Sequence, residues 1–322
     1  MYDYSMEKLV YQMFILGCDN LEIPLKKGLG GVIFFTKDIN SEDEWTQKIN
    51  NIKSQAWVPP FFSIDQEGGR VERTEYIREK RLSARHAYEK GLDYLKQQSE
   101  DISKELKEWG FNLNFAPCID INTNPNNPII GERAFANNVE DVIKGYKIFT
   151  NASRKFGIIP CAKHYPGHGD ADKDSHLTLP KIDLTLDEMQ KTHLKPFEYA
   201  ANNDIEMIMV AHLHCTCFDK EILPTSLSKN AIGYLRKDLN YNGVLISDDM
   251  VMKGVQVYGS LEAILKGIEA GLDMFIFRNS DEETLKIIDE LVKIVEKDKF
   301  LQDKITEANN RILKLKKSYK IV

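Results

Sequence analysis

The stretch Gly243-Val244-Leu245-Ile246-Ser247-Asp248-Asp249 places two carboxylates directly after a short apolar run. An apolar, β-branched run of this length is typical of a buried strand in a parallel sheet. The two carboxylates would then stand at the carboxyl end of the strand. In an α/β barrel, active sites are built at this end of the strands.

Three other apolar runs end in the same way. Phe62-Ser63-Ile64 leads into Asp65-Gln66-Glu67, Cys161-Ala162 into Lys163-His164, and Met209-Val210-Ala211 into His212. Each cluster alone could be an exposed strand end, which tolerates charge. Four clusters at the ends of separate strands predict that their side chains converge on one pocket.

Strand-like and helix-like segments alternate along the chain. The expected strands are Gly31–Phe35, Phe61–Ile64, Leu113–Ile119, Ile158–Ala162, Ile205–Val210, Val244–Ile246 and Asp273–Phe277, and an eighth could lie within Gln12–Gly17. The amphipathic stretches between them are Asp101–Trp109, Val139–Phe156, Leu184–Asn202, Asn230–Leu239 and Ser260–Ala270. This alternation predicts a complete or slightly irregular (β/α)8 barrel, with a doubly wound parallel sheet as the alternative.

The length and composition fit one barrel domain. A chain of 322 residues is normal for this fold, and 42% hydrophobic residues suffice for a sizeable core. We expect a single domain over residues 1–322, because no linker, repeat or change in composition divides the chain. The stretches Asp281–Lys297 and Gln302–Tyr319 predict two closing helices at about 281–320.

The charge and the cysteines exclude several classes of protein. A net charge of -6, from 43 basic and 49 acidic residues, offers no basic surface for nucleic acid. No apolar run approaches the roughly 18 residues of a membrane span, and Glu7, Lys8 and Gln12 precede the N-terminal apolar patch, unlike in an export signal. Five cysteines, an odd number, suit free thiols in a reducing compartment. We expect a cytoplasmic monomer without a cofactor.

The most distinctive stretch runs from Lys163 to His176 and holds three of the seven histidines. Asp174 and His176 could hydrogen-bond to each other, so that the carboxylate orients an imidazole able to donate and recover a proton near neutral pH. His168 is expected to order the loop through hydrogen bonds. A metal held by histidines and aspartates of this stretch is the alternative. The spacing does not match a tight zinc motif, so no metal is expected.

Two further motifs carry carboxylates. Asp248 follows its strand at a position from which a nucleophile can be held rigidly, and Asp249 would point away from it and cap the next segment. Ile64–Arg70 sets two carboxylates beside a Gly-Gly turn that allows close approach of a ligand. The same turn could instead contain an Asp65–Arg70 ion pair.

Together these motifs resemble glycoside hydrolase family 3, specifically its β-N-acetylglucosaminidase branch, which works in bacterial peptidoglycan recycling. The segments that match the family's signatures, in the family's order, are Ile64–Arg73, Ile129–Phe135, Lys163–Pro180, Pro224–Ser228 and Val244–Met250. The chain departs from the family at Tyr165, where phenylalanine is usual, and at Cys118-Ile119-Asp120, which varies a Pro-Val-x-Asp segment.

The resemblance implies a retaining double displacement on a terminal, non-reducing N-acetylglucosamine. Asp248 would be the nucleophile, and His176, paired with Asp174, would act as acid and then as base, where most retaining glycosidases use a second carboxylate. The residues implied to hold the sugar, or to lie beside it, are Asp65, Arg70, Arg133, Lys163, His164 and His212. The aglycone could be an anhydro-muropeptide, another peptidoglycan fragment or a chitooligosaccharide.

Other functions remain open at this point. A broader β-glycosidase, such as a β-glucosidase or β-xylosidase, would usually carry a second domain that supplies a glutamate acid. A histidine acid also leaves room for phosphate as the acceptor, as in an N-acetylglucosaminide phosphorylase. A silent sugar-binding protein would be expected to lack the nucleophile or the acid. A metal-dependent barrel hydrolase would lose its activity to a chelator.

Overall fold

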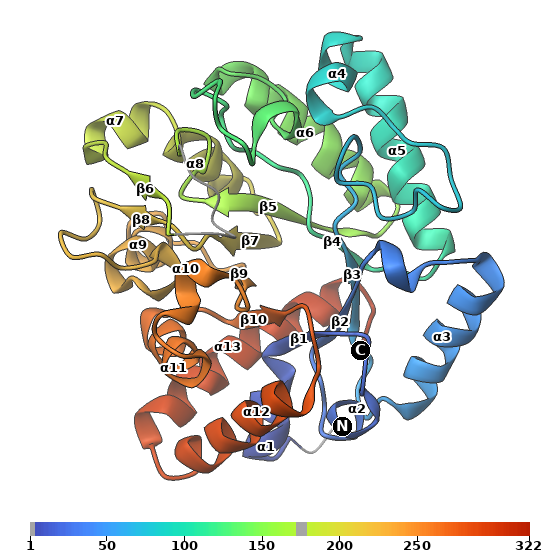
Figure 1. Ribbon diagram of the computed structural model, residues 1–322, viewed down its shortest axis with the longest axis vertical. Coiled ribbons are helices and arrows are strands. Elements are labelled where there is room, and N and C mark those ends of the chain that lie inside the picture. The colour runs from blue at the N-terminus through green and yellow to red at the C-terminus, as the bar shows by residue number, and fades with distance from the viewer. Residues whose placement is uncertain (1–3, 172–178) are drawn as a thin grey trace.

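A computed structural model describes residues 4–171 and 179–322. Within them, eight parallel strands form a closed barrel, and the last strand pairs with the first (Figure 1). In order around the barrel the strands are β1 (Phe14–Gly17), β2 (Gly31–Phe34), β3 (Phe61–Ile64), β4 (Leu113–Asn114), β5 (Ile159–Tyr165), β7 (Met207–Val210), β9 (Val244–Asp249) and β10 (Met274–Phe277). The predicted (β/α)8 barrel is confirmed, and its eighth strand is β1.

The strand β1 closes the barrel. It pairs on one side with β10, where Phe14 faces Phe275, and on the other side with β2, where Ile15 faces Gly31. A smaller parallel sheet lies outside the barrel and joins β6 (Lys181–Ile182) to β8 (His214–Cys215). Because β6 and β8 follow β5 and β7 along the chain, this small sheet lies on the side of the barrel where the strands end.

Helices surround the barrel (Figure 1). They are α1 (Met6–Gln12), α2 (Glu22–Lys26), α3 (Glu42–Gln55), α4 (Ala84–Glu89), α5 (Leu92–Glu108), α6 (Val139–Lys155), α7 (Leu186–Lys191), α8 (Leu194–Asn202), α9 (Lys229–Gly233), α10 (Lys253–Gln256), α11 (Ser260–Ala270), α12 (Glu282–Val295) and α13 (Lys299–Ser318). The last two helices pack against α1. No helix in the described parts of the chain has both the length and the apolar character needed to cross a membrane.

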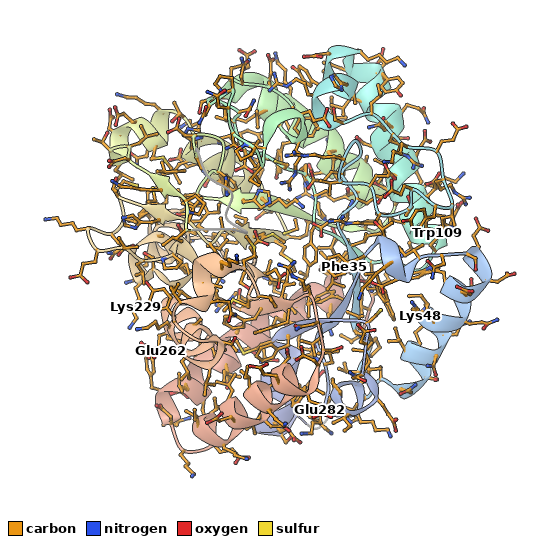
Figure 2. The ribbon with its side chains drawn as sticks, in the orientation of Figure 1. Phe35, Lys48, Trp109, Lys229, Glu262 and Glu282 are labelled. Atoms are coloured by element: carbon orange, nitrogen blue, oxygen red, sulfur yellow. The ribbon has the colours of Figure 1, made fainter. Side chains whose placement is uncertain are left out.

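The outer helices are amphipathic. In α12, Ile288 and Leu291 are buried, whereas Glu282 at the start of the helix is exposed on the outer surface (Figure 2). The N-cap Asp281 accepts a hydrogen bond from the backbone N–H of Thr284, which satisfies one free donor of the first turn. Such helices cover the barrel with one face and meet solvent with the other.

Two prolines explain two of the differences between the observed and the predicted elements. The strand expected over Leu113–Ile119 ends as β4 at Asn114, shortly before Pro117, which has no N–H for the sheet. The single helix expected over Leu184–Asn202 is divided into α7 and α8. In one continuous helix, the ring of Pro196 would clash with the carbonyl of Thr192, whereas in the first turn of α8 it is tolerated.

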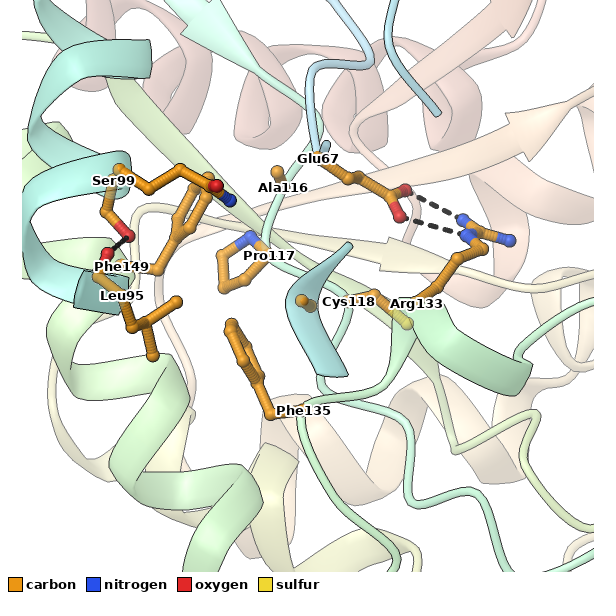
Figure 3. A pocket seen from close by; sticks show the side chains of 11 residues that line it. Glu67, Leu95, Ser99, Ala116, Pro117, Cys118, Arg133, Phe135 and Phe149 are labelled. Atoms are coloured by element: carbon orange, nitrogen blue, oxygen red, sulfur yellow. Dashed lines mark hydrogen bonds and ion pairs between the residues drawn. The ribbon is translucent and has the colours of Figure 1, made fainter. Parts of the chain in front are cut away.

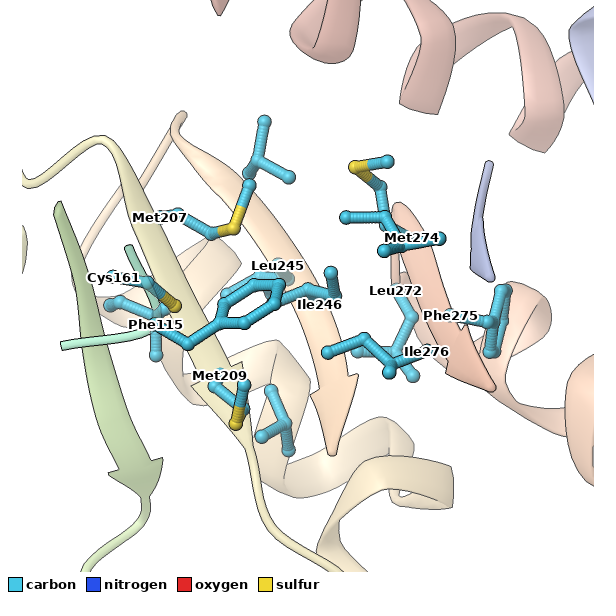
Figure 4. Close-up of a cluster of buried hydrophobic side chains, with 14 of the residues drawn as sticks. Phe115, Cys161, Met207, Met209, Leu245, Ile246, Leu272, Met274, Phe275 and Ile276 are labelled. Atoms are coloured by element: carbon cyan, nitrogen blue, oxygen red, sulfur yellow. The ribbon is translucent and has the colours of Figure 1, made fainter. Parts of the chain in front are cut away.

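The barrel interior is filled by large apolar side chains. Phe115, Met207, Met209, Ile246 and Ile276 are at most 3% exposed and lie together inside the strands (Figure 4). Alternate residues of a strand share one face, which is why Met207 and Met209 both point into this cluster. The interior is therefore a packed core, and a ligand can enter only above it.

The opposite end of the barrel holds a buried lysine. The amino group of Lys316, on α13, donates to Gln12 Oε1 at 2.7 Å and to the carbonyl of Pro59 at 2.9 Å. No carboxylate pairs with it in the described structure, and burial lowers the pKa of Lys316 to about 7. Gln12 precedes β1 and Pro59 precedes β3, so the contact ties α13 to the segments that enter the barrel.

Candidate active site

A cavity of about 390 Å³ opens at the carboxyl ends of the strands, a size that suits a small organic ligand. Phe115, Met209 and Ile276 from the core contribute its apolar surface. Its charged and polar lining residues are Asp65, Arg73, Arg133, Lys163, His164, His168, Asp248, Asp249 and Arg278. An apolar base with convergent polar groups is the usual character of a binding site.

The turn after β3 brings a carboxylate back toward the barrel. Gly68 and Gly69 have positive φ angles of 97° and 63°, in the region that glycine alone adopts readily. A Cβ atom on Gly68 would lie 2.4 Å from the carbonyl oxygen of Leu82. The turn therefore requires glycine, and the residue before it, Glu67, is buried beside Lys163.

Four charged side chains form a continuous network, and three of them, Asp65, Lys163 and Arg133, line the cavity. Lys163 Nζ lies 2.7 Å from Asp65 Oδ1 and 2.6 Å from Glu67 Oε1. Arg133 holds both oxygens of Glu67, with Nε 2.9 Å from Oε2 and Nη2 2.8 Å from Oε1. Two cations and two anions therefore compensate one another, as buried charges must.

This pairing fixes the charge of each member. Burial alone would raise the pKa of the Glu67 carboxyl, but the charges of Arg133 and Lys163 outweigh it and hold that pKa well below its usual range. Burial alone would lower the pKa of Lys163, but Asp65 and Glu67 raise it instead. Lys163 therefore stays protonated and can donate hydrogen bonds, but it cannot act as a base near neutral pH.

Asp120 orients His164. It accepts hydrogen bonds from the His164 backbone N–H at 3.1 Å and from His164 Nδ1 at 2.7 Å. Burial alone would raise the pKa of the Asp120 carboxyl, but these contacts outweigh it and lower the pKa to about 2. His164 Nε2 lies 3.2 Å from Arg133 Nη2, which can only donate. In this arrangement Nε2 accepts from Arg133, and Nδ1 donates to Asp120.

Asp248, the second-last residue of β9, opens into the cavity. Its Oδ1 accepts the backbone N–H of Asp249 at 2.7 Å. Burial alone would raise the pKa of the Asp248 carboxyl, but His164, His212 and this N–H outweigh it and lower the pKa. Asp248 is thus an ionised carboxylate held at a strand end. Asp249 accepts the backbone N–H of Val251, as expected of a cap, and pairs with Arg278. It was expected to point away from Asp248, but it lines the same cavity.

His212 supports Asp248 from behind. Its side chain is buried, and its Nε2 lies 3.2 Å from the backbone oxygen of Asp248. Because that oxygen can only accept, Nε2 carries the proton, and Nδ1 accepts from the Ser226 hydroxyl at 2.7 Å. His212 does not line the cavity. The prediction that it holds or lies beside the sugar is therefore wrong. His212 instead fixes the backbone of Asp248.

Comparison with known proteins identifies the family to which this barrel belongs. Residues 9–315 match the model of the glycosyl hydrolase family 3 N-terminal domain. The chain belongs to glycosyl hydrolase family 3. A beta-hexosaminidase of Methylococcus capsulatus is 32% identical over 86% of this chain and 83% of that protein. Beta-hexosaminidase A of Pseudoalteromonas piscicida is 31% identical over 92% of this chain.

The solved structures agree with this family. The structure of a glycoside hydrolase family 3 beta-N-acetylglucosaminidase from Paenibacillus sp. str. FPU-7 superposes with a TM-score of 0.93 at 28% identity and covers 99% of this chain. The chain spans 63% of that protein and 54% of the Pseudoalteromonas enzyme.

The family 3 barrel brings most of the predicted site residues together. Asp65, Arg133, Lys163, His164 and Asp248 line one cavity. The predicted acid pair, Asp174 and His176, lies outside the described residues. The roles of all these residues remain predictions.

Arg70 does not line the cavity. It is exposed, and its guanidinium donates to the backbone carbonyls of Pro128 and Ile129. Arg73 faces the cavity instead, with Nη2 3.9 Å from Asp65 Oδ2 and its guanidinium 5.7 Å from the centre of the Phe35 ring. The ion pair considered for Asp65 and Arg70 is therefore made by Arg73, because the Gly-Gly turn directs Arg70 outward.

Four charged residues of the site were missed from the sequence: Glu67, Arg73, Asp120 and Arg278. Glu67 and Asp120 stand in the motifs that were singled out, so their presence was visible. Their partners Lys163 and His164 are distant along the chain, and no local pattern indicates the pairing. Arg278 follows β10 directly, so the pattern of polar residues after strands would have found it.

Cys118, Asp120 and His164 are the described residues that best match a metal site. Their potential ligand atoms lie within 4.8 Å of one another. These atoms already bond to one another, since Asp120 Oδ2 accepts from both the Cys118 thiol, at 3.2 Å, and His164 Nδ1. Orientation of His164 is sufficient to account for this arrangement.

The imidazole of His168 differs from its neighbours. It is 2% exposed, and neither ring nitrogen has a hydrogen-bond partner within the described structure. The side chain of His168 was predicted to order the loop through hydrogen bonds, but the backbone of His168 makes these bonds instead. Its N–H donates to Asp120 Oδ1 at 2.6 Å, and its carbonyl accepts from Asn127 at 2.8 Å.

A second, narrow cavity lies behind the Glu67–Arg133 pair (Figure 3). Leu95, Phe135 and Phe149 line it, and its volume of about 10 Å³ is close to the smallest that holds one water molecule. It cannot take a sugar. The wider cavity on the other side of the ion pair is therefore the candidate substrate site.

Proposed function

We propose that this chain is an exo-acting, retaining β-N-acetylhexosaminidase that removes terminal, non-reducing β-linked N-acetylglucosamine from peptidoglycan fragments or related oligosaccharides. The observation that carries the proposal is that the ionised carboxylate of Asp248 opens into the same cavity as the Asp65–Lys163–Glu67–Arg133 network. A sugar held by that network would sit beside a potential nucleophile. The names of the curated relatives supply the sugar class.

The network suits the hydroxyl groups of a sugar. Lys163 and Arg133 can donate hydrogen bonds, and Asp65 can accept them, so one hydroxyl can bridge two members. Hydrogen bonds to charged groups are about twice as strong as neutral ones. The members hold one another in place before the ligand arrives, so little side-chain freedom is lost on binding.

Asp248 is the proposed nucleophile. Its carboxylate would attack the anomeric carbon, and the bond from that carbon to the leaving oxygen would break. Water would then release the sugar from the covalent glycosyl-enzyme. The lowered pKa keeps Asp248 ionised near neutral pH, and His212 and the Asp249 N–H hold it in place.

His176, oriented by Asp174, is the proposed acid and then base. Of the other described carboxylates of the cavity, Asp65 accepts a hydrogen bond from Lys163, and Asp249, whose pKa burial raises, is held in an ion pair with Arg278. An imidazole titrates near neutral pH, so it can give a proton to the leaving oxygen and take one from water.

The test uses an aryl β-N-acetylglucosaminide with a good leaving group. We expect Asp248→Ala to lose roughly 10⁴-fold in kcat, as nucleophile variants do, and Glu72→Gln, which changes a buried carboxylate that does not line the cavity, to keep most of the wild-type rate. Azide should rescue Asp248→Ala and give the inverted glycosyl azide. His176→Ala should harm natural substrates more than aryl ones. Full activity of Asp248→Ala would reject the nucleophile.

Substrate range and setting are part of the same proposal. A panel of aryl glycosides that differ at the 2-position separates an N-acetylglucosaminidase from a β-glucosidase or β-xylosidase, and assays with and without phosphate separate hydrolysis from phosphorolysis. We propose a monomeric, cytoplasmic enzyme with one barrel domain over residues 1–322. All five cysteines are free thiols, as in a reducing compartment.

A further inference from the structure

Two cysteines meet where β8 ends, with Cys215 as its last residue and Cys217 in the turn that follows. The backbone carbonyl of Cys215 accepts from the N–H of Phe218 at 3.1 Å and from that of Asp219 at 3.3 Å, which folds the chain back around Cys217. The two sulfur atoms lie 3.2 Å apart, at hydrogen-bond distance. The turn therefore holds two thiols in direct contact.

The geometry allows the thiols to bond. Residues two apart are at most about 7 Å apart between Cα atoms even when extended, and a turn shortens this span. Disulfides bridge Cα atoms that are about 4.4–6.8 Å apart, with a sulfur–sulfur bond of about 2.05 Å. Rotation of one half-buried side chain, Cys217, can close the remaining gap without moving the barrel.

The pair differs chemically from the other thiols. The hydrogen bond from Cys215 lowers the pKa of Cys217, and the thiolate is the reactive form of cysteine. Burial raises the pKa of Cys118 and Cys161 well above the usual range, and it raises that of Cys18 to about 12. Of the five cysteines, Cys217 thus combines partial exposure with a lowered pKa.

The dithiol lies next to segments that flank the candidate site. Ile182 of β6 pairs with Cys215 of β8, and the Thr216 N–H donates to the Ile182 carbonyl at 3.1 Å. In the sequence, β6 follows shortly after His176. Phe218 packs on Tyr165, the residue after His164, with ring centres 6.4 Å apart.

We propose that Cys215 and Cys217 are a redox modification site that forms a reversible intramolecular disulfide when the protein meets a hydroperoxide. With hydrogen peroxide, the Cys217 thiolate attacks one peroxide oxygen, the O–O bond breaks, and the other oxygen leaves as hydroxide, which a proton converts to water. The Cys215 sulfur then attacks the resulting Cys217 sulfenic acid, the S–S bond forms, and the S–O bond breaks to release a second water. The two thiols supply the two electrons that reduce one peroxide.

The disulfide would be readily reversible. A ring that contains only one intervening residue is strained, and strained disulfides are reduced easily by cellular thiols. Cytosolic disulfides, where they occur, are typically transient ones of this kind. The inference concerns thiol chemistry alone and does not depend on the proposed glycosidase activity.

The experiment counts thiols in the full-length protein. Reduced protein is treated with hydrogen peroxide, denatured and alkylated. Its intact mass is then measured by mass spectrometry, and its tryptic peptides are mapped. We expect the loss of two of the five alkylation sites and a peptide Thr192–Lys220, which carries both cysteines, lighter by two hydrogen atoms. Dithiothreitol should restore all five sites.

Two variants serve as controls. Cys217→Ser should form no disulfide, whereas Cys18→Ser, which removes the other half-buried thiol, should form it at the wild-type rate. The proposal is overturned if wild-type protein keeps five alkylatable thiols, if the disulfide maps to another pair, or if Cys217 passes to sulfinic acid without bonding to Cys215. Each result is independent of enzymatic turnover.

Discussion

Glu67→Gln is the substitution that most directly tests the charged network. Glu67 makes three charge-assisted contacts, two with Arg133 and one with Lys163. A glutamine can keep about one of them through its single carbonyl oxygen. The loss of two such contacts, at roughly 1.5–3 kcal/mol each, agrees with the roughly 3–5 kcal/mol measured when one partner of a buried pair is removed.

That loss has two expected readouts. With an unfolding entropy of roughly 2.1 cal/mol/K per residue, a loss of 3–5 kcal/mol in a chain of 322 residues lowers Tm by about 4–7 °C. Arg133 and Lys163 would also lose their fixed positions, so we expect kcat/KM for an aryl β-N-acetylglucosaminide to fall by about 100-fold, or about 2.7 kcal/mol.

A matched control separates stability from binding. Glu72 is also buried, accepts from the Thr74 hydroxyl at 2.9 Å and does not line the cavity. Glu72→Gln should lower Tm and leave kcat/KM within about twofold of wild type at a temperature where both variants are folded. If Glu67→Gln kept kcat/KM within that same range, the network would not position the sugar-binding groups, and the reasoning would fail.

Three further substitutions, one of them with a matched control, test separate contacts. Asp120→Asn removes the charge that orients His164, so kcat/KM should fall by about 10–100-fold, and an unchanged value would show that the orientation is unimportant. Gly169→Ala would place a Cβ atom 1.7 Å from the Ile121 carbonyl oxygen and should lower Tm, whereas Gly233→Ala, with nothing within 4 Å, should not. In the folded protein Lys316 stays neutral down to about pH 7, whereas in the unfolded chain it binds a proton below about pH 10. The free energy of unfolding of the wild type, relative to that of Lys316→Met, should therefore rise between these pH values by at most about 1.4 kcal/mol per pH unit. Urea titrations at several pH values measure it, and equal pH dependence of the two proteins would contradict the burial argument.

The barrel was predictable because its signals are local. Each strand is a short apolar run, and its end is marked by polar residues such as Asp248, which is how the cavity residues were found. The division of the Leu184–Asn202 helix was also readable, since Pro196 alone excludes a continuous helix. The length of β5, which runs to Tyr165 through charged residues, was not readable, because it depends on partners in β4 and β7.

The pairing within the site was not predictable from spacing. Glu67 contacts Lys163 and Arg133 only because the barrel closes. The distances between these side chains cannot be inferred from a single sequence. Likewise, the choice between Arg70 and Arg73 depends on the direction in which the chain leaves the Gly-Gly turn. That direction is set by contacts with Leu82 and Ser83, which are remote from the motif itself.

The pairing of Phe14 with Phe275 has a consequence for synthesis on the ribosome. The strand β1 is synthesised about 260 residues before its partner β10. At roughly 5–20 residues per second, β10 follows after roughly 13–50 s. During this interval β1 has an unpaired edge, and the nascent chain already carries Asp65, Lys163 and their apolar surroundings. A chaperone that shields short hydrophobic edges would therefore act mainly on the early half of the nascent chain and would be released once the last strand arrives.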